Sequence, residues 1–546
     1  MLVVLIAVFA LGRGDASSFF HCKDKDLVEF SKIEDVENQE ETIGFGLPLL
    51  EIPSVYQGQF GSKEYAVFVE SSSETELKGH YLALDKEMSD SIAFHLFFDG
   101  ENLHFVSHDI DICQKISELH SDGRKVEGVV QQSFLNQTHF SFSFYETQQF
   151  VEYDTIRYQQ PQFEIQRSNG VHFANVVGYW SELDERTNSE IDMFLHLNQV
   201  LNEHNLDLYM DVYSPKNDTL AKRPFVMLIH GGAFYYGSRK DETVSRLCKH
   251  LASLGYVTAS IDYRIGFQPT KDGIERSGYC AIQDTHAAMR FVTANQDAFG
   301  IDTSMMFIGG CSAGAITALG LAFMTNETRP LSTRESLFNT ELGDIQSSGN
   351  GLDARFSLKG VVDMWGAMPD LALLEGKNIP IVAFHGDADN ILPYGCDFPF
   401  GAIGNAKKLL FNKMYGSSCI VAREKELGVK SELYTFKGYK HSPQIAGRSA
   451  VRGEMNDNFY FVQDKMCAFL DEIIRENKPQ VVKRNGWYQL DGEVYQCNWA
   501  AEGGLIVDNK CGDAKVVWIG NAPQCKLKVS GIQKYGVGFT QEVRVK

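Results

Sequence analysis

Short apolar runs alternate with helical patterns through the middle of this 546-residue chain, from residue 169 to 479. Residues 225–229 (FVMLI), 256–261 (YVTASI) and 379–384 (IPIVAF) are examples, and they lack the polar alternation of a strand with one face in water. Strands of this kind are buried on both faces, as they are in a parallel sheet that helices cover on both sides. We therefore expect an α/β domain with a doubly wound, mostly parallel sheet at residues 169–479.

The stretches on either side of this domain show strand patterns instead. Residues 19–168 contain alternating polar and apolar positions, as at 139–145 (HFSFSFY), which predicts a β-rich accessory domain. Residues 480–546 predict a small β module with three cysteines and a hairpin about Asp491 and Gly492. The functions of both flanking stretches stay open at this point.

The first residues predict a leader peptide. Residues 2–11 (LVVLIAVFAL) form an apolar run that is too short to span a bilayer but matches the core of a signal peptide. Small residues follow at Gly14, Ala16, Ser17 and Ser18, so we expect residues 1–18 to be removed and the protein to be secreted. No other run of 18 or more apolar residues occurs, and we expect no membrane span.

The cysteines and glycosylation sequons fit an oxidising, extracellular compartment. Eleven cysteines are present, an odd number, so at least one has no partner within the chain; Cys396 and Cys419 are a reasonable local disulfide pair. Asn136, Asn217 and Asn326 begin N-x-S/T sequons and are candidate glycosylation sites. No C-x-x-C spacing occurs, and we expect neither a metal nor a cofactor.

The charge balance narrows the range of partners. Fifty-one basic and 71 acidic residues give a formal net charge of −20 at pH 7. Nucleic acids and anionic membranes bind basic surfaces, so neither is an expected partner. The oligomeric state does not follow from the sequence.

The strongest chemical motif is Gly310-Cys311-Ser312-Ala313-Gly314. It follows the apolar run 305–308 and precedes a helical pattern, which is the setting that a nucleophile elbow requires. The serine must lie on a sharp turn between strand and helix, where side chains at the two glycine positions would clash. Ser312 is therefore the candidate nucleophile, and Cys311 is expected to be packed and inert.

A second glycine-rich loop, His230-Gly231-Gly232-Ala233-Phe234, follows the apolar run 225–229. Its backbone N–H groups can point at a developing oxyanion together with the N–H after the serine. The expected donors are Gly232 and Ala233 of this loop and Ala313 of the elbow. His230 is expected to orient the loop rather than to act as a base.

The acid and the base should follow the serine in the order Ser, Asp, His. Two aspartates, Asp387 and Asp389, stand in the loop after the apolar run 379–384; Asp389 is favoured as the acid, and Asp387 is expected to cap the turn. Asp363 is a more distant alternative. His441 is the one histidine downstream of Asp389, and it follows an apolar run, so it is the candidate base.

These motifs, in this order, resemble the α/β-hydrolase superfamily in its secreted carboxylesterase-like branch. The similarity lies in residues 223–234, 255–264, 309–314 and 385–389, with Ala233 where many relatives carry a third glycine. The resemblance implies a serine hydrolase that cleaves small-molecule or polymeric carboxylic esters through an acyl-enzyme.

Two alternatives stay open at this stage. The scaffold could cleave amides, peptides or polyesters, or it could serve as a non-catalytic binding or adhesion protein. Asp284, on the helix before the elbow strand, is expected to pair with a nearby base such as Arg264 in a structural role.

Overall fold

The computed structural model describes residues 150–153, 155–181, 202–445, 454–518 and 525–544, together with strands between residues 54 and 144. The predicted leader, residues 1–18, lies outside the described residues. The chain divides into two compact units. One comprises Asp154–Lys478 with Ile532–Phe539, and the other comprises Met1–Tyr153, Pro479–Gly531 and Thr540–Lys546.

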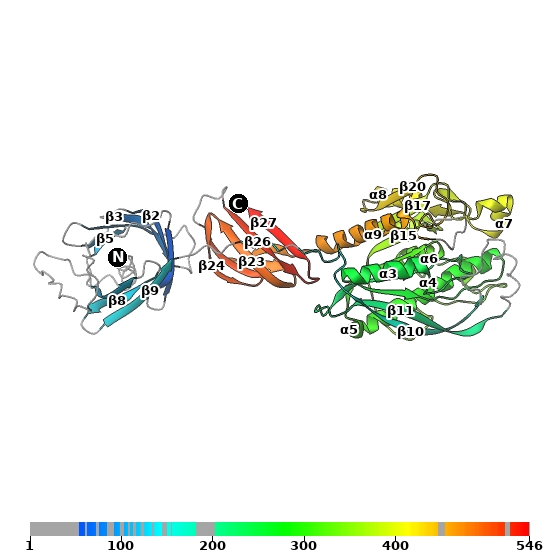
Figure 1. Cartoon of the computed structure of the whole chain (residues 1–546), viewed down its shortest axis with the longest axis horizontal. Coiled ribbons are helices and arrows are strands. Elements are labelled where there is room, and N and C mark those ends of the chain that lie inside the picture. Colours follow the sequence, from blue (N-terminus) through cyan, green and yellow to red (C-terminus); the bar gives the residue numbers. More distant parts are fainter. Residues whose placement is uncertain are drawn as a thin grey trace, which may run out of the picture. The chain divides into compact units, whose positions relative to one another are not determined.

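The first of these, which we call the central unit, is built on an eight-stranded sheet (Figure 1). In spatial order the strands are β10 (Ile165–Gly178), β11 (His204–Pro215), β13 (Val257–Ile261), β12 (Arg223–Ile229), β14 (Ile301–Cys311), β15 (Leu358–Met364), β17 (Ile381–Gly386) and β20 (Glu432–Phe436). β10, β11 and β13 pair antiparallel, and all pairs from β13 to β20 are parallel. The sheet and its helices confirm the α/β class expected from the sequence.

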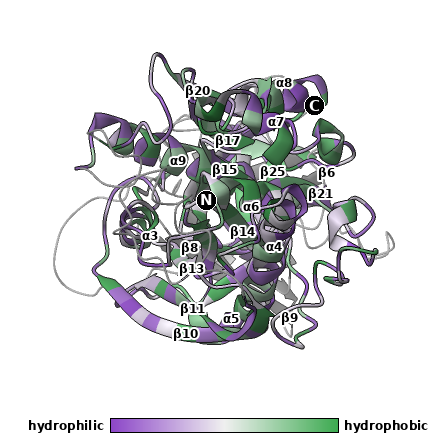
Figure 2. Ribbon diagram, turned by 90° about the vertical axis from the view of Figure 1, so that its right-hand side faces the viewer, coloured by the Kyte–Doolittle hydropathy of each residue, from purple (hydrophilic) through white to green (hydrophobic). Residues whose placement is uncertain are grey.

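Both faces of this sheet are buried, which explains why its strands show no polar alternation. In β12, Phe225, Met227 and Ile229 belong to one apolar cluster, and Val226 and Leu228 belong to the other. The first cluster includes residues of α4 (Lys271–Ala294), α6 (Ala313–Phe323) and α8 (Ser417–Glu426). The second includes residues of α3 (Glu242–Leu254) and α9 (Asp457–Glu476), so helices pack on both faces. Figure 2 shows the inner strands as hydrophobic and the exposed part of β10 as largely hydrophilic.

The helix next to the glycine-rich loop has well-defined ends. The Asp241 side chain accepts a hydrogen bond from Val244 N at 3.1 Å, which caps the start of α3. Gly255, with a φ of 116°, ends the helix in the left-handed region that glycine adopts without strain. The caps set where the chain turns into and out of the helix between β12 and β13.

The boundaries of the central unit differ from the division expected from the sequence. The expected boundary at residue 168 falls inside β10, which pairs with β11 from Ile165 onward and so belongs to the sheet. At the other end, the turn between β26 (Lys526–Gln533) and β27 (Gly538–Arg544) belongs to the central unit. There the buried Tyr535 hydroxyl donates to Asp302 at 3.1 Å, and Lys534 pairs with the same carboxylate at 2.9 Å.

The other unit contains β-sheets. One is a nine-stranded antiparallel sheet with the order β6-β5-β4-β3-β2-β1-β9-β8-β7. Its strands, in chain order, are β1 (Ser54–Phe60), β2 (Lys63–Ser72), β3 (Glu76–Ala83), β4 (Ile92–Phe98), β5 (Leu103–Ser107), β6 (Ile110–Ile112), β7 (Ile116–Ser121), β8 (Lys125–Ser133) and β9 (Asn136–Phe144). Smaller sheets follow with the orders β21-β22-β25-β24 and β23-β26-β27. Their remaining strands are β21 (Gln480–Arg484), β22 (Trp487–Asp491), β23 (Val494–Glu502), β24 (Gly504–Lys510) and β25 (Asp513–Trp518).

The hairpin predicted about Asp491 and Gly492 is wrong. β22 and β23, on either side of these residues, belong to different sheets, and β22 pairs instead with β21. The turn between β21 and β22 is Asn485-Gly486, and both residues have positive φ angles, 51° and 79°. An Asn-Gly pair adopts this turn readily, and its twist matches that of the flanking strands.

The disulfide predicted between Cys396 and Cys419 is also wrong, because both thiols are free. Cys396 lies in β18 (Cys396–Asp397), opposite Tyr415 of β19 (Met414–Gly416), while Cys419 lies on α8. Among the other described cysteines, Cys248, Cys280, Cys311, Cys467, Cys497 and Cys511 are also free thiols.

Two other expectations concern single side chains. The predicted pair of Arg264 and Asp284 is confirmed, with Nη2 of the arginine 2.7 Å from Oδ1 of the aspartate and both side chains buried.

Among the candidate glycosylation sites, Asn217 is exposed in a turn, and the Asn326 amide is bonded to Gln346 Oε1 at 3.3 Å. Asn136 is the first residue of β9. Glycosylation at all three sites stays a prediction.

Candidate active site

Ser312 lies on a strained turn at the carboxyl end of the central strand β14. Its φ of 55° and ψ of −118° are unusual for a residue with a side chain, and α6 begins at the next residue. A Cβ at Gly310 would lie 2.4 Å from the backbone of Gly314, and a Cβ at Gly314 would lie 2.2 Å from the Ile229 oxygen. The two glycines are therefore required by close backbone approach, and the turn lifts the serine hydroxyl out of the sheet.

The structure brings together the three residues that the sequence selected. The Nε2 atom of His441 lies 2.8 Å from Ser312 Oγ, and its Nδ1 atom lies 2.7 Å from Asp389 Oδ2. Each side chain stands just beyond the carboxyl end of a parallel strand: β14, β17 or β20. With Nδ1 protonated, the ring donates to Asp389 and its Nε2 lone pair accepts from the serine hydroxyl.

Asp389 is held ionised and in one orientation. Its side chain is fully buried, and its Oδ1 atom accepts from the backbone N–H groups of Ile391 and Leu392 at 2.7 and 3.1 Å. Burial by itself raises the pKa of this carboxyl, but His441 and His385 together hold it well below its usual value. The carboxylate is thus ready to fix an imidazole and to stabilise its cation.

The competing aspartates have different positions. Asp387 accepts a hydrogen bond from Gly438 N at 2.6 Å, and this contact joins the loops after β17 and β20. Asp363 is completely buried at the end of β15 and accepts from Gly366 N at 2.8 Å. Neither residue reaches the His441 ring by a hydrogen bond, whereas Asp389 does.

The glycine-rich loop after β12 lies against the elbow. A Cβ at Gly231 would be 3.3 Å from Ser312 Cβ, and Gly232 has a φ of 112° that suits glycine. The backbone N–H groups of Ala233 and Ala313 have no backbone acceptor within the described residues. Both alanines line the same cavity as Ser312, whereas Gly232 does not. The N–H group of Gly232 likewise has no backbone acceptor among the described residues, so all three expected oxyanion donors stay candidates, and Ala233 and Ala313 are the two that border the cavity.

His230 is buried and hydrogen-bonds to the backbone of this loop. Its Nδ1–H donates to Gly231 O at 2.7 Å, and its ring stacks on Tyr263 with centroids 4.2 Å apart. The Tyr263 hydroxyl donates to the backbone oxygens of His230 and Gly231. Burial lowers the pKa of His230 to about 4, so the ring is neutral at pH 7. His230 is thus a hydrogen-bonded loop residue, as the sequence indicated.

Arg239, which the sequence did not single out, holds the far end of the loop. Its backbone N–H donates to Asp262 Oδ1 at 2.8 Å, and its guanidinium binds Asp262 Oδ2 at 2.5 Å. The same guanidinium binds the buried Asp211 at 3.1 Å, and Arg167 binds the other oxygen of Asp211 at 2.6 Å. These contacts tie the loop to β11 and to the end of β13.

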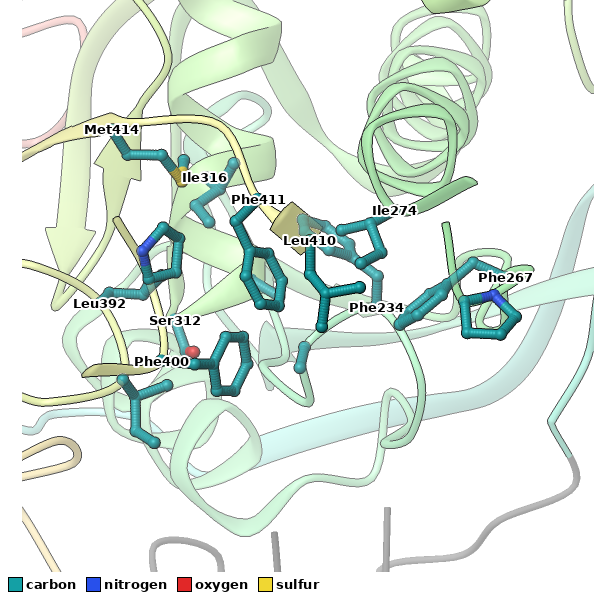
Figure 3. Close-up of a pocket in the computed structure, with 15 residues that line it drawn as sticks. Phe234, Phe267, Ile274, Ser312, Ile316, Leu392, Phe400, Leu410, Phe411 and Met414 are labelled. Atoms are coloured by element: carbon teal, nitrogen blue, oxygen red, sulfur yellow. The ribbon is translucent and has the colours of Figure 1, made fainter. Parts of the chain in front are cut away.

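A cavity of about 100 Å³ opens beside Ser312 (Figure 3). Apart from the serine, its lining is apolar: Ala233, Phe234, Phe267, Pro269, Ile274, Ala313, Ile316, Ile391, Leu392, Pro399, Phe400, Leu410, Phe411 and Met414. Residues 391–414, between β17 and α8, supply seven of these side chains, a contribution that the sequence did not indicate. Phe400 and Phe411 stack with ring centroids 4.9 Å apart.

Two kinds of feature are absent from the described residues. In the parts of the chain that the structure describes, no three His, Cys, Asp or Glu side chains are placed to hold a metal ion. No helix within those parts is long and apolar enough to cross a membrane.

The sheet order and the Ser, His and Asp geometry define the class of this unit, and a sequence match agrees with them. Residues 210–379 match the family model described as BD-FAE, an α/β-hydrolase-type esterase family. The central unit thus has the sheet order and the Ser, His and Asp arrangement of an α/β-hydrolase, and its residues 210–379 are similar to this esterase family.

Individual relatives share only part of the chain. Gut esterase 1 of Caenorhabditis elegans is 33% identical over 110 residues, which are 20% of this chain and 19% of that protein. Esterase LipC of Mycobacterium tuberculosis is 31% identical over 121 residues, 22% of this chain and 28% of that protein. The chain thus spans less than a third of the length of either. A solved structure of Thermogutta terrifontis esterase 2 phosphorylated by paraoxon aligns at 20% identity and a TM-score of 0.34, covering 49% of this chain and 90% of that one.

Proposed function

We propose that this protein is a secreted serine hydrolase that cleaves carboxylic esters through an acyl-enzyme. The observation that carries the proposal is the continuous hydrogen-bonded set of Ser312, His441 and Asp389 at the wall of an apolar cavity. Each distance is within hydrogen-bonding range, and Ser312 shares the cavity with Ala233 and Ala313, whose N–H groups have no backbone acceptor among the described residues. Acyl transfer needs these parts: a nucleophile, a base, a group that orients the base, and donors for the oxyanion.

The proposed reaction runs in two halves. His441 Nε2 takes the proton of Ser312 as Oγ attacks the ester carbonyl, and Asp389 stabilises the imidazolium that forms. The N–H groups of Ala233 and Ala313 hold the tetrahedral oxyanion, and His441 returns the proton to the departing alcohol. Water, deprotonated by the same ring, then cleaves the acyl-serine and releases the acid.

The cavity supports a substrate class. Its lining contains one polar side chain, Ser312 itself, so it provides no partner for a charged or strongly polar acyl group. An acyl group entering it would pack against Phe400 and Phe411 (Figure 3). We therefore propose small-molecule esters of short apolar acids as substrates.

The test uses the purified full chain with p-nitrophenyl acetate, butyrate and octanoate. We expect hydrolysis of the butyrate ester by the native protein and none above background by Ser312→Ala. A fluorophosphonate probe should label Ser312, as found by peptide mass spectrometry. Labelling of another residue, or an unchanged rate in Ser312→Ala, would refute the proposal.

The same experiment separates the alternatives. A binding or adhesion protein on this scaffold has no use for an intact, hydrogen-bonded acid, base and nucleophile, so the intact set favours catalysis. Protein that bound no probe and cleaved no ester would point to that role instead. An amide panel of matched acyl groups would show whether peptides or amides are turned over faster than esters.

Secretion is part of the proposal and has its own test. It rests on the predicted leader at residues 1–18 and on the sequons at Asn136, Asn217 and Asn326. Expressed in a secretory host, the chain should reach the medium with its N-terminus near residue 19. Treatment with an N-glycosidase should lower the mass of the secreted protein. Protein that stays in the cell with residues 1–18 still attached would contradict the proposed secretion.

A further inference from the structure

A second histidine reaches the carboxylate that orients His441. The Nε2 atom of His385 lies 3.2 Å from Asp389 Oδ2, the same oxygen that His441 contacts at 2.7 Å. His385 is the next-to-last residue of β17, and its side chain is fully buried. The carboxylate is thus placed between two imidazole rings.

His385 is itself held from its other side. Its Nδ1 atom lies 2.8 Å from Ser417 Oγ at the start of α8, and this oxygen lies 2.6 Å from Asp363 Oδ2. Asp363, Ser417 and His385 are all fully buried. A chain of four side chains, from Asp363 through Ser417 and His385 to Asp389, therefore runs beneath the candidate site without contact with water.

One placement of the protons on these four side chains is inconsistent with the distances between them. If Asp363 were ionised and His385 neutral, Ser417 would donate to Asp363 and His385 Nδ1–H would donate to Ser417. The bare lone pair of His385 Nε2 would then face the Asp389 carboxylate, setting two acceptors against each other at 3.2 Å. An unmet contact of this kind is costly in a fully buried site.

Two arrangements give each contact a donor. In the first, Asp363 is ionised and His385 is doubly protonated, which buries an additional carboxylate and an imidazolium. In the second, Asp363 is a neutral acid: it donates to Ser417 Oγ, Ser417 donates to His385 Nδ1, and His385 Nε2–H donates to Asp389. The second satisfies the same contacts with no additional buried charge, so it is favoured.

We propose that His385 is a positioning residue for Asp389, kept in its Nε2–H tautomer by Ser417 and a protonated Asp363. The proposal rests on the proposed function, because the role of Asp389 is to orient the base. With two imidazole donors and two backbone donors, Asp389 has its lone pairs filled and cannot rotate away from His441.

The surroundings agree with this assignment. Burial raises the pKa of Asp363, although Ser417 and His385 act in the opposite direction. Within the described residues, the other titratable group in contact with His385 is Tyr394, whose ring is perpendicular to the imidazole with centroids 5.7 Å apart. The Tyr394 hydroxyl bonds to Thr435 Oγ1 at 2.8 Å and so does not compete for the imidazole.

The first experiment compares two neighbouring serines of α8. Ser417→Ala removes the donor to His385 Nδ1, and we expect kcat on p-nitrophenyl butyrate to fall about ten- to hundredfold with KM unchanged. Ser418→Ala is the matched control, because Ser418 donates to the backbone oxygen of Tyr394 at 2.7 Å and takes no part in the chain. Equal kcat in the two variants would overturn the proposal.

The second experiment tests the proton on Asp363. In Asp363→Asn, the amide oxygen can accept from Gly366 N while the NH2 group donates to Ser417, as the protonated acid does. We expect this variant to keep near-native kcat and Asp363→Leu, of similar shape, to lose about as much as Ser417→Ala. If Asp363→Asn lost as much as Asp363→Leu, an ionised Asp363 would be required and the assignment would fail.

A third measurement does not depend on catalysis. Proton spectra of 15N-histidine-labelled protein should show a downfield resonance bonded to His385 Nε2, absent in His385→Gln and lost or shifted in Ser417→Ala. A proton on His385 Nδ1 alone would refute the tautomer even if the protein is an esterase. Inactive native protein that still shows the Nε2 proton would instead count against the proposed function.

Discussion

His441 Nε2 lies 2.8 Å from Ser312 Oγ, although 129 residues separate the two along the chain. The contact is made because β14 and β20 run in the same direction in one sheet and present their following loops at the same edge. Asp389, after β17, reaches the same edge and contacts the far nitrogen of the ring. The parallel sheet thus brings the three side chains together. The roles of these residues and of the residues around them can be tested by single substitutions.

Asp389 is expected to be needed for the orientation of the base. Asp389→Asn replaces an acceptor with an amide that can donate to His441 Nδ1 and favour the wrong tautomer. We expect kcat on p-nitrophenyl butyrate to fall by roughly four orders of magnitude, as in other sites of this type. Asp387→Asn is the control, because Asp387 bonds to Gly438 N, and its kcat should stay within about threefold of native. Similar losses of kcat in both variants would show that the conformation of the loop after β17, and not the Asp389 carboxylate, is needed for activity.

Phe400 is expected to limit the length of the acyl group. It lines the cavity beside Ser312 and stacks on Phe411, so Phe400→Ala should enlarge the apolar space. The ratio of kcat/KM for octanoate over acetate esters should rise about tenfold. Leu409→Ala removes an apolar side chain from the same segment, but Leu409 is 78% exposed and outside the cavity lining. If both variants shifted the ratio equally, the cavity would not be the acyl site.

Arg239 is expected to stabilise the glycine-rich loop. Arg239→Gln would leave the carboxylates of Asp211 and Asp262 without this guanidinium, and we expect the free energy of unfolding to fall by about 3 kcal/mol. Urea unfolding measures the loss. The control is Arg246→Gln, which breaks an exposed pair with Glu242 and should change stability by less than about 0.5 kcal/mol. Equal losses of unfolding free energy in the two variants would mean that the buried ion pairs of Arg239 stabilise the protein no more than the exposed pair does.

Glu424 is expected to make stability depend on pH near neutrality. Its side chain is buried in α8, its Oε1 atom has no hydrogen-bond partner in the described structure, and burial raises its pKa to about 7. A raised pKa in the folded state means that the proton on Glu424 contributes stability that is present below pH 4.5 and lost as the pH rises through 7.

Glu424→Gln removes this titration. The melting temperature of the native protein should drop from pH 5 to pH 8 by about 2 to 4 °C more than that of the variant. Glu426→Gln, at an exposed position two residues away, should follow the native curve. A native curve that stayed flat over this range would show that Glu424 does not titrate there.

Much of the site was predictable because each part has a local signal. Ser312, Asp389 and His441 each follow an apolar run, and the order of the motifs along the chain selects Ser312, His441 and the loop that carries Asp389. Gly310 and Gly314 mark the strained turn directly, since a side chain at either position would meet backbone within 2.5 Å. Short-range sterics of this kind are written in the sequence around each residue.

Other features have no local signal. The predictions of a Cys396–Cys419 disulfide and of a hairpin about Gly492 were wrong. Proximity along the chain does not determine which side chains meet or which strands pair. The turn at residues 532–539 joins the central unit through Tyr535 and Asp302, which are 233 residues apart.

The apolar patterns and the motifs therefore specified the α/β class and the three side chains of the candidate site. Only the folded chain decided what surrounds them: the aromatic wall of the cavity and the buried chain from Asp363 to Asp389. The physical reason is that cavity walls and proton positions depend on atoms from separate elements packed within a few ångströms of one another. No pattern along a single stretch of sequence records such distances.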